Sequence, residues 1–464
     1  MLITVVEKPF LFPLKFVLIS LTVFLISNLL LTTQVSAQSP LPDRPYLIGW
    51  FSTTDQEDPL ASLAEMASSG TKIVIPFGIG AFSTEEETAA YLDEAQRLGV
   101  QVIVDLHVHP DLGGNFPSIE ELAAKVAIHR DHPAVFGWLI ADEPSVFPAE
   151  TPAYTLEFYN RVKDYDPTHP VMIIHWYGAD FDPYVDSTDF LILNFYPTYT
   201  RDDPTEFNSW VRQSYSHWLI GNQWVENNNR EGLITAVQGF GPELYNSREM
   251  TMAEYRFHVL SSLVLETDAI VFYLETYPDS FLKSKINDLI SLTQVIGFQM
   301  KNGLTYDPSI TVSELPDQLV YRHGTDSLGQ HVILTVNIAE HDAENNDGSQ
   351  LSNVLFSLPS EAQPPYVEVL TENRIIRVYD NTFLDNFDKF AVHAYSFNED
   401  PLAVPIPYFG DGDVDQSSSV DAEDFRLVLA AWGKYNLDDP ENQNHDYQTN
   451  FIDGAVVLAN WSGN

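Results

Sequence analysis

The chain has 464 residues, of which 44% are hydrophobic and 12% aromatic, so it can bury a large core and is not a disordered polypeptide. Its formal net charge of −43 comes from 66 acidic and 23 basic side chains. A surface this negative repels phosphate backbones and argues against nucleic acid as a partner. The chain has no cysteine, so no disulfide bond stabilises it.

Residues 1–37 have the pattern of a cleaved secretory signal. Lys8 and Lys15 precede the apolar run "FVLISLTVFLISNLLL", and "VSA" before Gln38 fits a cleavage site with small residues. The alternative is an uncleaved membrane anchor, because the run is near the lower limit of spanning length. We expect cleavage, a secreted extracellular protein and no membrane attachment afterwards.

Residues 45–303 are predicted to form a (β/α)8 barrel. Eight apolar runs alternate with segments whose apolar residues recur at helical spacing, which indicates a parallel sheet covered by helices. Eight repeats in about 250 residues fit a barrel better than an open sheet. The eight runs are "YLIGWFS", "TKIVIPFG", "VQVIVDLH", "VFGWLIADE", "PVMIIHWYG", "DFLILNFYP", "GLITAVQGFG" and "DAIVFYLET".

Residues 306–398 change in pattern. Runs such as "QHVILTVNI" and "FAVHAYSF" alternate between apolar and polar residues, with polar turns between them and no helical period. This predicts a small antiparallel β-sandwich. Residues 399–410 contain several prolines and are predicted to be a linker.

Residues 411–464 contain a pattern typical of a calcium-binding loop. Positions 1, 3, 5, 7, 9 and 12 of this loop are Asp413, Asp415, Ser417, Ser419, Asp421 and Asp424. Their spacing is that of EF-hand ligands, so we expect them to bind Ca2+. The loop and the segment "FRLVLAAWG" after it resemble a dockerin repeat, which implies a cohesin-like protein partner. A second copy near Asp446 lacks one loop residue and has Val456 at position 12, so we expect one good site and one impaired site.

In a (β/α)8 barrel, functional residues lie at the carboxyl ends of the strands. The predicted strands end in acids, imidazoles, amides and aromatic rings, a set that suits glycoside hydrolysis. These residues are Trp50, Asp105, His107, Asp142, Glu143, His175, Trp176, Asn194, Tyr196, Gln238, Tyr273 and Glu275.

The segments "VIVDLHVHPDLGGN", "GWLIADEP" and "NFYP" resemble the third, fourth and sixth strands of clan A glycoside hydrolases, the cellulase and β-galactosidase superfamily. The resemblance implies that Glu143 donates a proton to a poly- or oligosaccharide and that the barrel needs no cofactor. The predicted substrate-binding residues are Trp50, His107, Asp142, His175, Trp176, Asn194, Tyr196, Gln238 and Tyr273.

The chain departs from this family where the seventh strand ends. The family has a nucleophilic Glu there, and this chain has Gln238, whose amide cannot form a covalent glycosyl intermediate. Glu275 is our first expectation for the second carboxylate, and Glu243 is another candidate. The other accounts are an inverting enzyme and a barrel that binds sugar without cleaving it.

Two further alternatives concern individual residues. His107 and His109, with Asp105, have the spacing of a metal-ligand pattern, so a metal-dependent hydrolase is the second enzymatic hypothesis. The structural alternative for Glu143 is that it caps a helix beginning at Pro144.

The predicted calcium loop gives a first test. Chelation of Ca2+ should unfold residues 411–464 and leave the activity of the barrel unchanged, because metal binding and folding are coupled only within the tail. Circular dichroism and a glycan hydrolysis assay, each with and without chelator, measure the two effects. A simultaneous loss of tail structure and barrel activity would contradict separate domains.

Overall fold

The computed structural model describes part of the chain. The predicted signal, linker and calcium-loop tail lie outside the described residues, so these remain predictions. Among the residues described, no helix has the length and apolar character needed to cross a membrane. The described residues are 46–398 except 54–57, 109–116, 148, 177, 199–206, 242–248, 275–279, 302–307, 314–317, 326–329, 340–349, 360–363 and 373.

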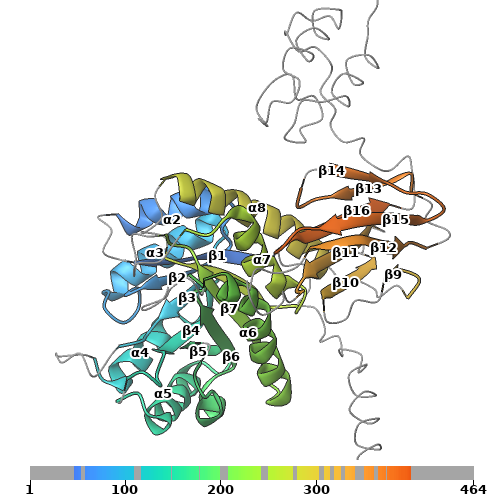
Figure 1. Ribbon diagram of the computed structural model, residues 1–464. Coiled ribbons are helices and arrows are strands. Elements are labelled where there is room, and N and C mark those ends of the chain that lie inside the picture. The colour runs from blue at the N-terminus through green and yellow to red at the C-terminus, as the bar shows by residue number, and fades with distance from the viewer. Residues whose placement is uncertain are drawn as a thin grey trace, which may run out of the picture. The chain divides into compact units, whose positions relative to one another are not determined.

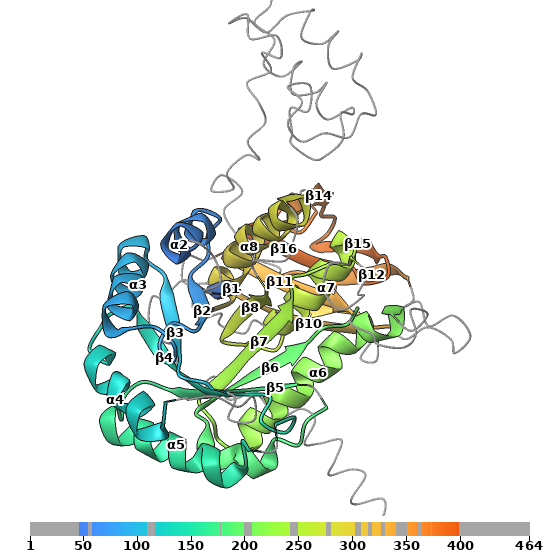
Figure 2. The ribbon, with the colours of Figure 1, turned by 90° about the vertical axis from the view of Figure 1, so that its left-hand side faces the viewer.

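The first eight strands form a closed barrel (Figures 1 and 2). Every strand pairs in parallel with the next one along the chain, and β8 pairs with β1. The predicted barrel is therefore confirmed, and each of the eight apolar runs contains one strand. The strands are β1 (Leu47–Thr53), β2 (Ile73–Phe77), β3 (Gln101–Asp105), β4 (Val135–Asp142), β5 (Val171–Trp176), β6 (Phe190–Phe195), β7 (Gly232–Gln238) and β8 (Ala269–Tyr273).

Helices connect the strands and surround the barrel (Figure 2). Capping boxes explain where several of them begin. Thr84 and Glu87 satisfy each other's backbone amides at the start of α3, and Ser118 and Thr251 start α4 and α7 in the same way. The helices are α2 (Pro59–Ser68), α3 (Glu85–Leu98), α4 (Ile119–His129), α5 (Pro152–Tyr165), the 3-10 helix η2 (Asp182–Ser187), α6 (Phe207–Asn227), α7 (Met252–Leu263) and α8 (Ser280–Lys301).

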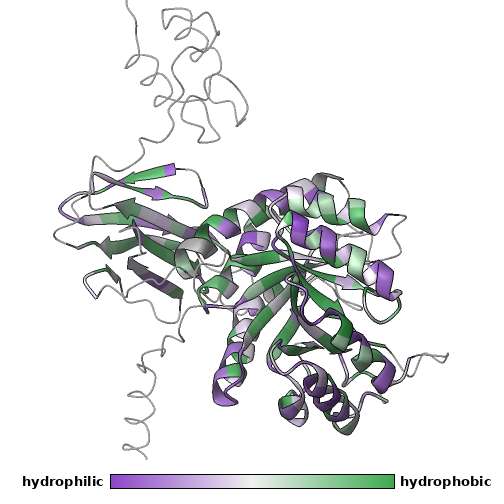
Figure 3. Ribbon diagram, turned by 180° about the vertical axis from the view of Figure 1, so that it is seen from behind, coloured by the Kyte–Doolittle hydropathy of each residue, from purple (hydrophilic) through white to green (hydrophobic). Residues whose placement is uncertain are grey.

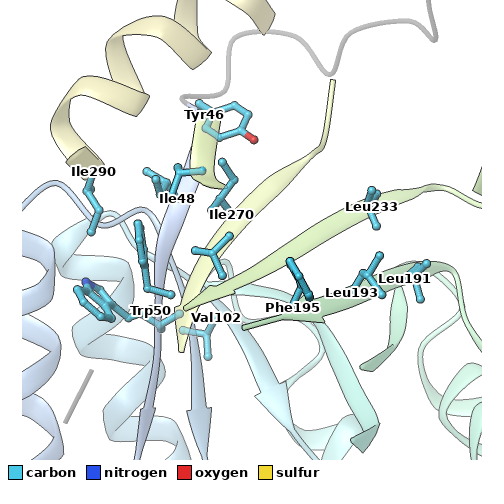
Figure 4. Close-up of a cluster of buried hydrophobic side chains, with 14 of the residues drawn as sticks. Tyr46, Ile48, Trp50, Val102, Leu191, Leu193, Phe195, Leu233, Ile270 and Ile290 are labelled. Carbon is cyan, nitrogen blue, oxygen red and sulfur yellow. The ribbon is translucent and has the colours of Figure 1, made fainter. Parts of the chain in front are cut away.

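Two separate apolar clusters show which face of each strand is inside. One cluster contains alternate strand residues such as Ile174 and Ile192 and no helix residue, so it fills the barrel interior. The other contains the intervening strand residues together with helix residues such as Leu63, and it lies between strands and helices. Figure 3 shows the barrel strands as mostly apolar, and Figure 4 shows part of the outer cluster. Burial on both faces is expected for a parallel barrel.

A register shift in β4 decides which residues reach the interior. Leu139 pairs with Met172, and both belong to the interior cluster. The register then shifts, so that Asp142 pairs with Ile174, another interior residue. Strict alternation from Leu139 would have turned Asp142 outward. The irregularity, which has the effect of a β-bulge, therefore turns Asp142 into the barrel.

The remaining strands form two antiparallel sheets, of five strands (order β10-β11-β16-β13-β14) and three strands (order β15-β12-β9). One apolar cluster takes side chains from both sheets, including Val367 and Phe356, as in a β-sandwich. The strands are β9 (Thr311–Val312), β10 (Leu319–Thr325), β11 (Gln330–Asn337), β12 (Leu351–Ser357), β13 (Tyr366–Val369), β14 (Arg374–Arg377), β15 (Thr382–Phe387) and β16 (Val392–Asn398).

A charged network joins these two sheets. His393 contacts Asp385 through Nδ1 at 2.9 Å and Glu372 through Nε2 at 3.1 Å. Arg374 also contacts both carboxylates, and the Tyr395 hydroxyl donates to Asp385 at 2.7 Å. Burial opposes the charged forms, but these contacts prevail and lower the pKa of both Asp385 and Glu372 to about 2. They also raise the pKa of His393, against the opposing effect of its burial.

These shifts predict how the stability of the sandwich depends on pH. The two carboxylates stabilise the fold above about pH 4, their unfolded range, and lose this effect as pH falls toward 2. His393 stabilises it fully below about pH 6.5 and progressively less as pH rises through its raised pKa. The network should therefore contribute most between about pH 5 and 6.5.

Asp385→Asn should lower the free energy of unfolding by about 3–5 kcal/mol, because it removes one of the two carboxylates that His393 and Arg374 contact, the one that is more deeply buried. It should also flatten the acid limb of the pH dependence. Calorimetric unfolding at a series of pH values measures both effects. Asp380→Asn, at an exposed turn, is the matched control. An unchanged acid limb in the Asp385 variant would contradict the assignment.

Candidate active site

The carboxylate of Glu143 is held at the end of β4. Its Oε1 accepts a hydrogen bond of 2.6 Å from Nδ2 of Asn194, the last inward-facing residue of β6. The backbone of Glu143 is in the left-handed region, with φ at 50°, and its amide donates to the carbonyl of Ile174 at 2.9 Å. This conformation is uncommon for a residue with a side chain and often marks a functional site. Glu143 caps no helix, since α5 begins at Pro152 with Thr151 as its N-cap, so the capping alternative is wrong.

Asp142 precedes Glu143, lies on the interior face and is partly buried. Burial raises its pKa to about 7, and the negative charges of Glu143, Asp105 and Glu150 add to that effect. His107 acts in the opposite direction and is not strong enough to restore the usual value. Two adjacent carboxyl groups, one of which titrates near neutrality, can hold or release a proton during a reaction.

His107 is the imidazole of this acidic region. Its Nε2 lies 3.3 Å from Oε1 of Glu150, and both side chains are buried. Its backbone amide donates to Oδ1 of Asp105 at 3.0 Å, while the amide of Gly78 donates to Oδ2 at 2.9 Å. Burial alone would lower the pKa of His107, but the contact with Glu150 and the nearby acids outweigh it and raise that pKa. These acids therefore favour the protonated form of His107.

Aromatic rings gather on the other side of the barrel mouth. Tyr196 and Tyr273 stack with their centroids 5.3 Å apart, and the Phe240 ring lies 5.4 Å from Tyr196. Phe51 lies 5.6 Å from Tyr273, and Phe77 lies 5.2 Å from Phe51. Since β8 is opposite β4 in a closed barrel of eight strands, these five residues form an aromatic wall across the barrel from the acids, in which Tyr196, Tyr273 and Phe77 are partly exposed and Phe51 and Phe240 are buried. Flat apolar surfaces next to carboxyl groups suit sugar rings.

Gln238 ends β7 and is completely buried. Its Oε1 accepts from the amide of Thr198 at 3.1 Å, and its Nε2 donates to the Thr198 hydroxyl and, at 3.0 Å, to the carbonyl of Phe240. Its backbone amide donates to Nε2 of His258 at 3.1 Å. Both ends of the side chain are therefore used to hold the loops after β6 and β7.

Two expected substrate-binding residues lie on the outer faces of their strands. Trp50 is fully buried in the cluster between strands and helices, 5.2 Å from the Phe272 ring (Figure 4). His175 is buried between the rings of Phe181 and Tyr184, and burial lowers its pKa to about 3. The expectation that these two side chains line the mouth is wrong.

Side chains alternate between the two faces of a strand, and Trp50 and His175 are each adjacent to an interior residue, so both face outward. Trp176 lies on the inner face, half-buried, and its Nε1 donates to the Ser145 hydroxyl at 3.2 Å.

Several predicted residues cannot be placed. Glu275, Glu243 and His109 lie outside the described residues, as does the whole calcium loop, so their roles stay predictions. In the described part of the chain, no group of three or more His, Asp or Glu side chains could hold a metal ion.

The sequence analysis missed Glu150 and the phenylalanines of the aromatic wall. Glu150 lies in the loop between β4 and α5, where no periodicity or motif links it to His107. Phe51 and Phe77 lie within or at the end of predicted strands, but strands that are buried on both faces carry no signal that marks these two residues as inward-facing.

No family model matches the chain, and no curated protein matches it. It resembles solved structures that include α-galactosidase I from Mortierella vinacea, at 13% identity and a TM-score of 0.46 over 76% of this chain and 96% of that one. A GH30 endoxylanase from Clostridium papyrosolvens C71 has 15% identity and a TM-score of 0.45, and the match covers 76% of this chain and 97% of that one. An α-L-arabinofuranosidase from Thermotoga maritima has 12% identity and a TM-score of 0.47, and the match covers 76% of this chain and 96% of that one. Likeness at this level does not bear on what this chain does.

The bonds of Gln238 predict the effect of restoring a carboxylate at this position. Gln238→Glu should lower the free energy of unfolding by about 2–4 kcal/mol, because a carboxylate cannot donate to Thr198 and Phe240 and would be buried against a carbonyl oxygen. Urea unfolding of the variant and the wild type measures the difference. The matched control is Gln223→Glu, which makes the same change at an exposed position of α6. Equal stability of wild type and Gln238→Glu would show that the amide is not needed there.

Proposed function

We propose that the barrel is a glycoside hydrolase in which Glu143 protonates the oxygen of the scissile bond of a poly- or oligosaccharide. The observation that carries the proposal is the position of Glu143. It lies at the carboxyl end of β4, accepts a hydrogen bond from Asn194, and is across the barrel from the partly exposed, stacked rings of Tyr196 and Tyr273. In barrel enzymes this end of the strands is where catalytic residues lie.

The neighbouring groups have chemically consistent roles. Asn194 donates to Oε1 of Glu143, which leaves the second carboxyl oxygen to carry the transferable proton. The stacked rings of Tyr196 and Tyr273 offer an apolar face to a sugar ring. The proposal requires Glu143 as the acid and does not depend on which group attacks the anomeric carbon.

The second candidate function is carbohydrate binding without cleavage. The observation that favours it is Gln238, whose amide occupies the end of β7 and is used entirely in hydrogen bonds within the protein. A barrel of this kind would keep its aromatic wall and bind glycans, but would not hydrolyse them.

We also propose that the protein works outside the cell and is attached to a larger assembly. The signal pattern of residues 1–37 supports export, and the loop ligands from Asp413 to Asp424 support Ca2+ binding in the tail. The dockerin-like repeat supports a cohesin-like partner protein. A metal-dependent hydrolase that uses His107 and His109 remains the second enzymatic alternative.

Glu143→Gln tests the proposed function. It should keep the fold and reduce kcat on a glycan that the wild type cleaves by about 100-fold to 10,000-fold, since an amide cannot supply the proton. Release of reducing ends from a panel of polysaccharides measures cleavage, and calorimetry on the same glycans measures binding.

Glu86→Gln, which removes an exposed carboxylate from the first turn of α3, is the matched control and should act like the wild type. Cleavage that survives in Glu143→Gln would overturn the role of Glu143. Binding without any cleavage by the wild type would favour the second candidate function.

A further inference from the structure

Glu143 and Asp142 both reach the barrel mouth from the carboxyl end of β4. They are consecutive residues, whose Cα atoms are about 3.8 Å apart across one peptide unit, at the end of one strand. A glycosidase that uses two carboxyl groups has them on opposite sides of the sugar, about 5–5.5 Å apart when retaining and about 6.5–9.5 Å apart when inverting. With Glu143 as the acid, this common origin does not suit Asp142 as the group that attacks the anomeric carbon from the opposite face.

The described strands across the barrel offer no carboxylate in that position. The last interior residues of β6, β7 and β8 are Asn194, Gln238 and Tyr273. Asn194 is bonded to Glu143, and Gln238 is held by Thr198 and Phe240. An attacking atom that belongs to the substrate itself fits this arrangement of the described strands.

We propose that this site cleaves 1,2-trans glycosides of 2-acetamido-2-deoxy sugars, with the substrate's acetamido oxygen as the nucleophile and Asp142 as the acceptor of the acetamido N–H. This inference rests on the proposed function, because it needs Glu143 as the acid. An acetamido oxygen can reach the anomeric carbon from the face opposite a trans leaving group. Glycosidases that use their substrate in this way need no enzyme nucleophile.

The reaction is balanced with water as the only other reactant. First, the acetamido oxygen bonds to C1 while the bond from C1 to the glycosidic oxygen breaks. The bonding electrons leave with the glycosidic oxygen, which takes the proton of Glu143. The sugar is now a cationic oxazolinium ring whose N–H donates to the Asp142 carboxylate. The Glu143 carboxylate then takes a proton from water, whose oxygen bonds to C1 and displaces the acetamido oxygen.

The surroundings of Asp142 suit this role. The side chain faces the interior beside Glu143, where a negative charge would stabilise the cationic ring. The groups that face it are Asp105 and His107 from β3 and its loop, Glu143, and Glu150 from the loop after β4. Because the pKa of Asp142 is about 7 and its ionised form is required, kcat/KM should fall as pH drops through about 7.

Matched pairs of 4-nitrophenyl β-glycosides test the proposal. Each pair consists of mono- and oligosaccharides that differ only in a 2-acetamido or 2-hydroxy group on the sugar at the cleavage point. We expect cleavage only of the 2-acetamido member, with the anomeric configuration retained in the first product seen by NMR. Asp142→Asn should lower kcat by about 100-fold and remove the acid limb of the pH profile.

A binding measurement separates this role from a structural one. A thiazoline analogue of the oxazolinium ring should bind the wild type at least about tenfold more tightly than Asp142→Asn, as charge stabilisation requires. The matched control is Asp131→Asn, at an exposed position before β4, which should bind the analogue like the wild type.

The possible outcomes distinguish this inference from the proposed function. Cleavage of a 2-hydroxy glycoside that is lost in Glu143→Gln would overturn the inference and leave the proposed function intact. Inversion at the anomeric carbon would likewise overturn the inference and leave the proposed function intact. Failure to cleave any member of the pairs or any polysaccharide of the panel would overturn both.

Discussion

A closed parallel barrel gives each strand one face toward the interior and one toward the helices, and the site depends on this division. The interior cluster fixes which residue of each strand faces inward, and the next inward residue toward the carboxyl end then points into the mouth. Asn194, Gln238 and Tyr273 reach the mouth in this way. Trp50 and His175, one residue out of phase, are buried against helices and loops instead.

The β4 strand reaches the mouth through an exception to that alternation. Its register shift turns Asp142 inward, and the left-handed backbone of Glu143 lets the next side chain reach Asn194. Two consecutive acids thereby enter the same site. Their mutual repulsion is offset in part by His107, whose pKa is raised by contact with the buried carboxylate of Glu150. The arrangement concentrates proton-transfer groups on one side of the barrel.

The opposite side of the mouth has a different character. Aromatic rings from β1, β2 and β8 and from the loops after β6 and β7 form a wall, and Gln238 beneath it connects those two loops. Because its amide donates and accepts at once, it fills a structural role that a carboxylate could not. The absence of an acid at this position thus has a local physical cause.

The sequence by itself determined the barrel, its strand order and the residues that end each strand, because eight apolar runs separated by amphipathic helices allow few other arrangements. It identified Glu143 and Asn194 as rim residues without indicating that they bond. It could not assign inward and outward faces, since strands buried on both sides carry no polar alternation that would distinguish them. The register shift in β4, the contact of His107 with Glu150, and the bonds of Gln238 were decided only by the tertiary structure. Each joins residues on different strands or loops, and their geometry follows from packing rather than from local sequence.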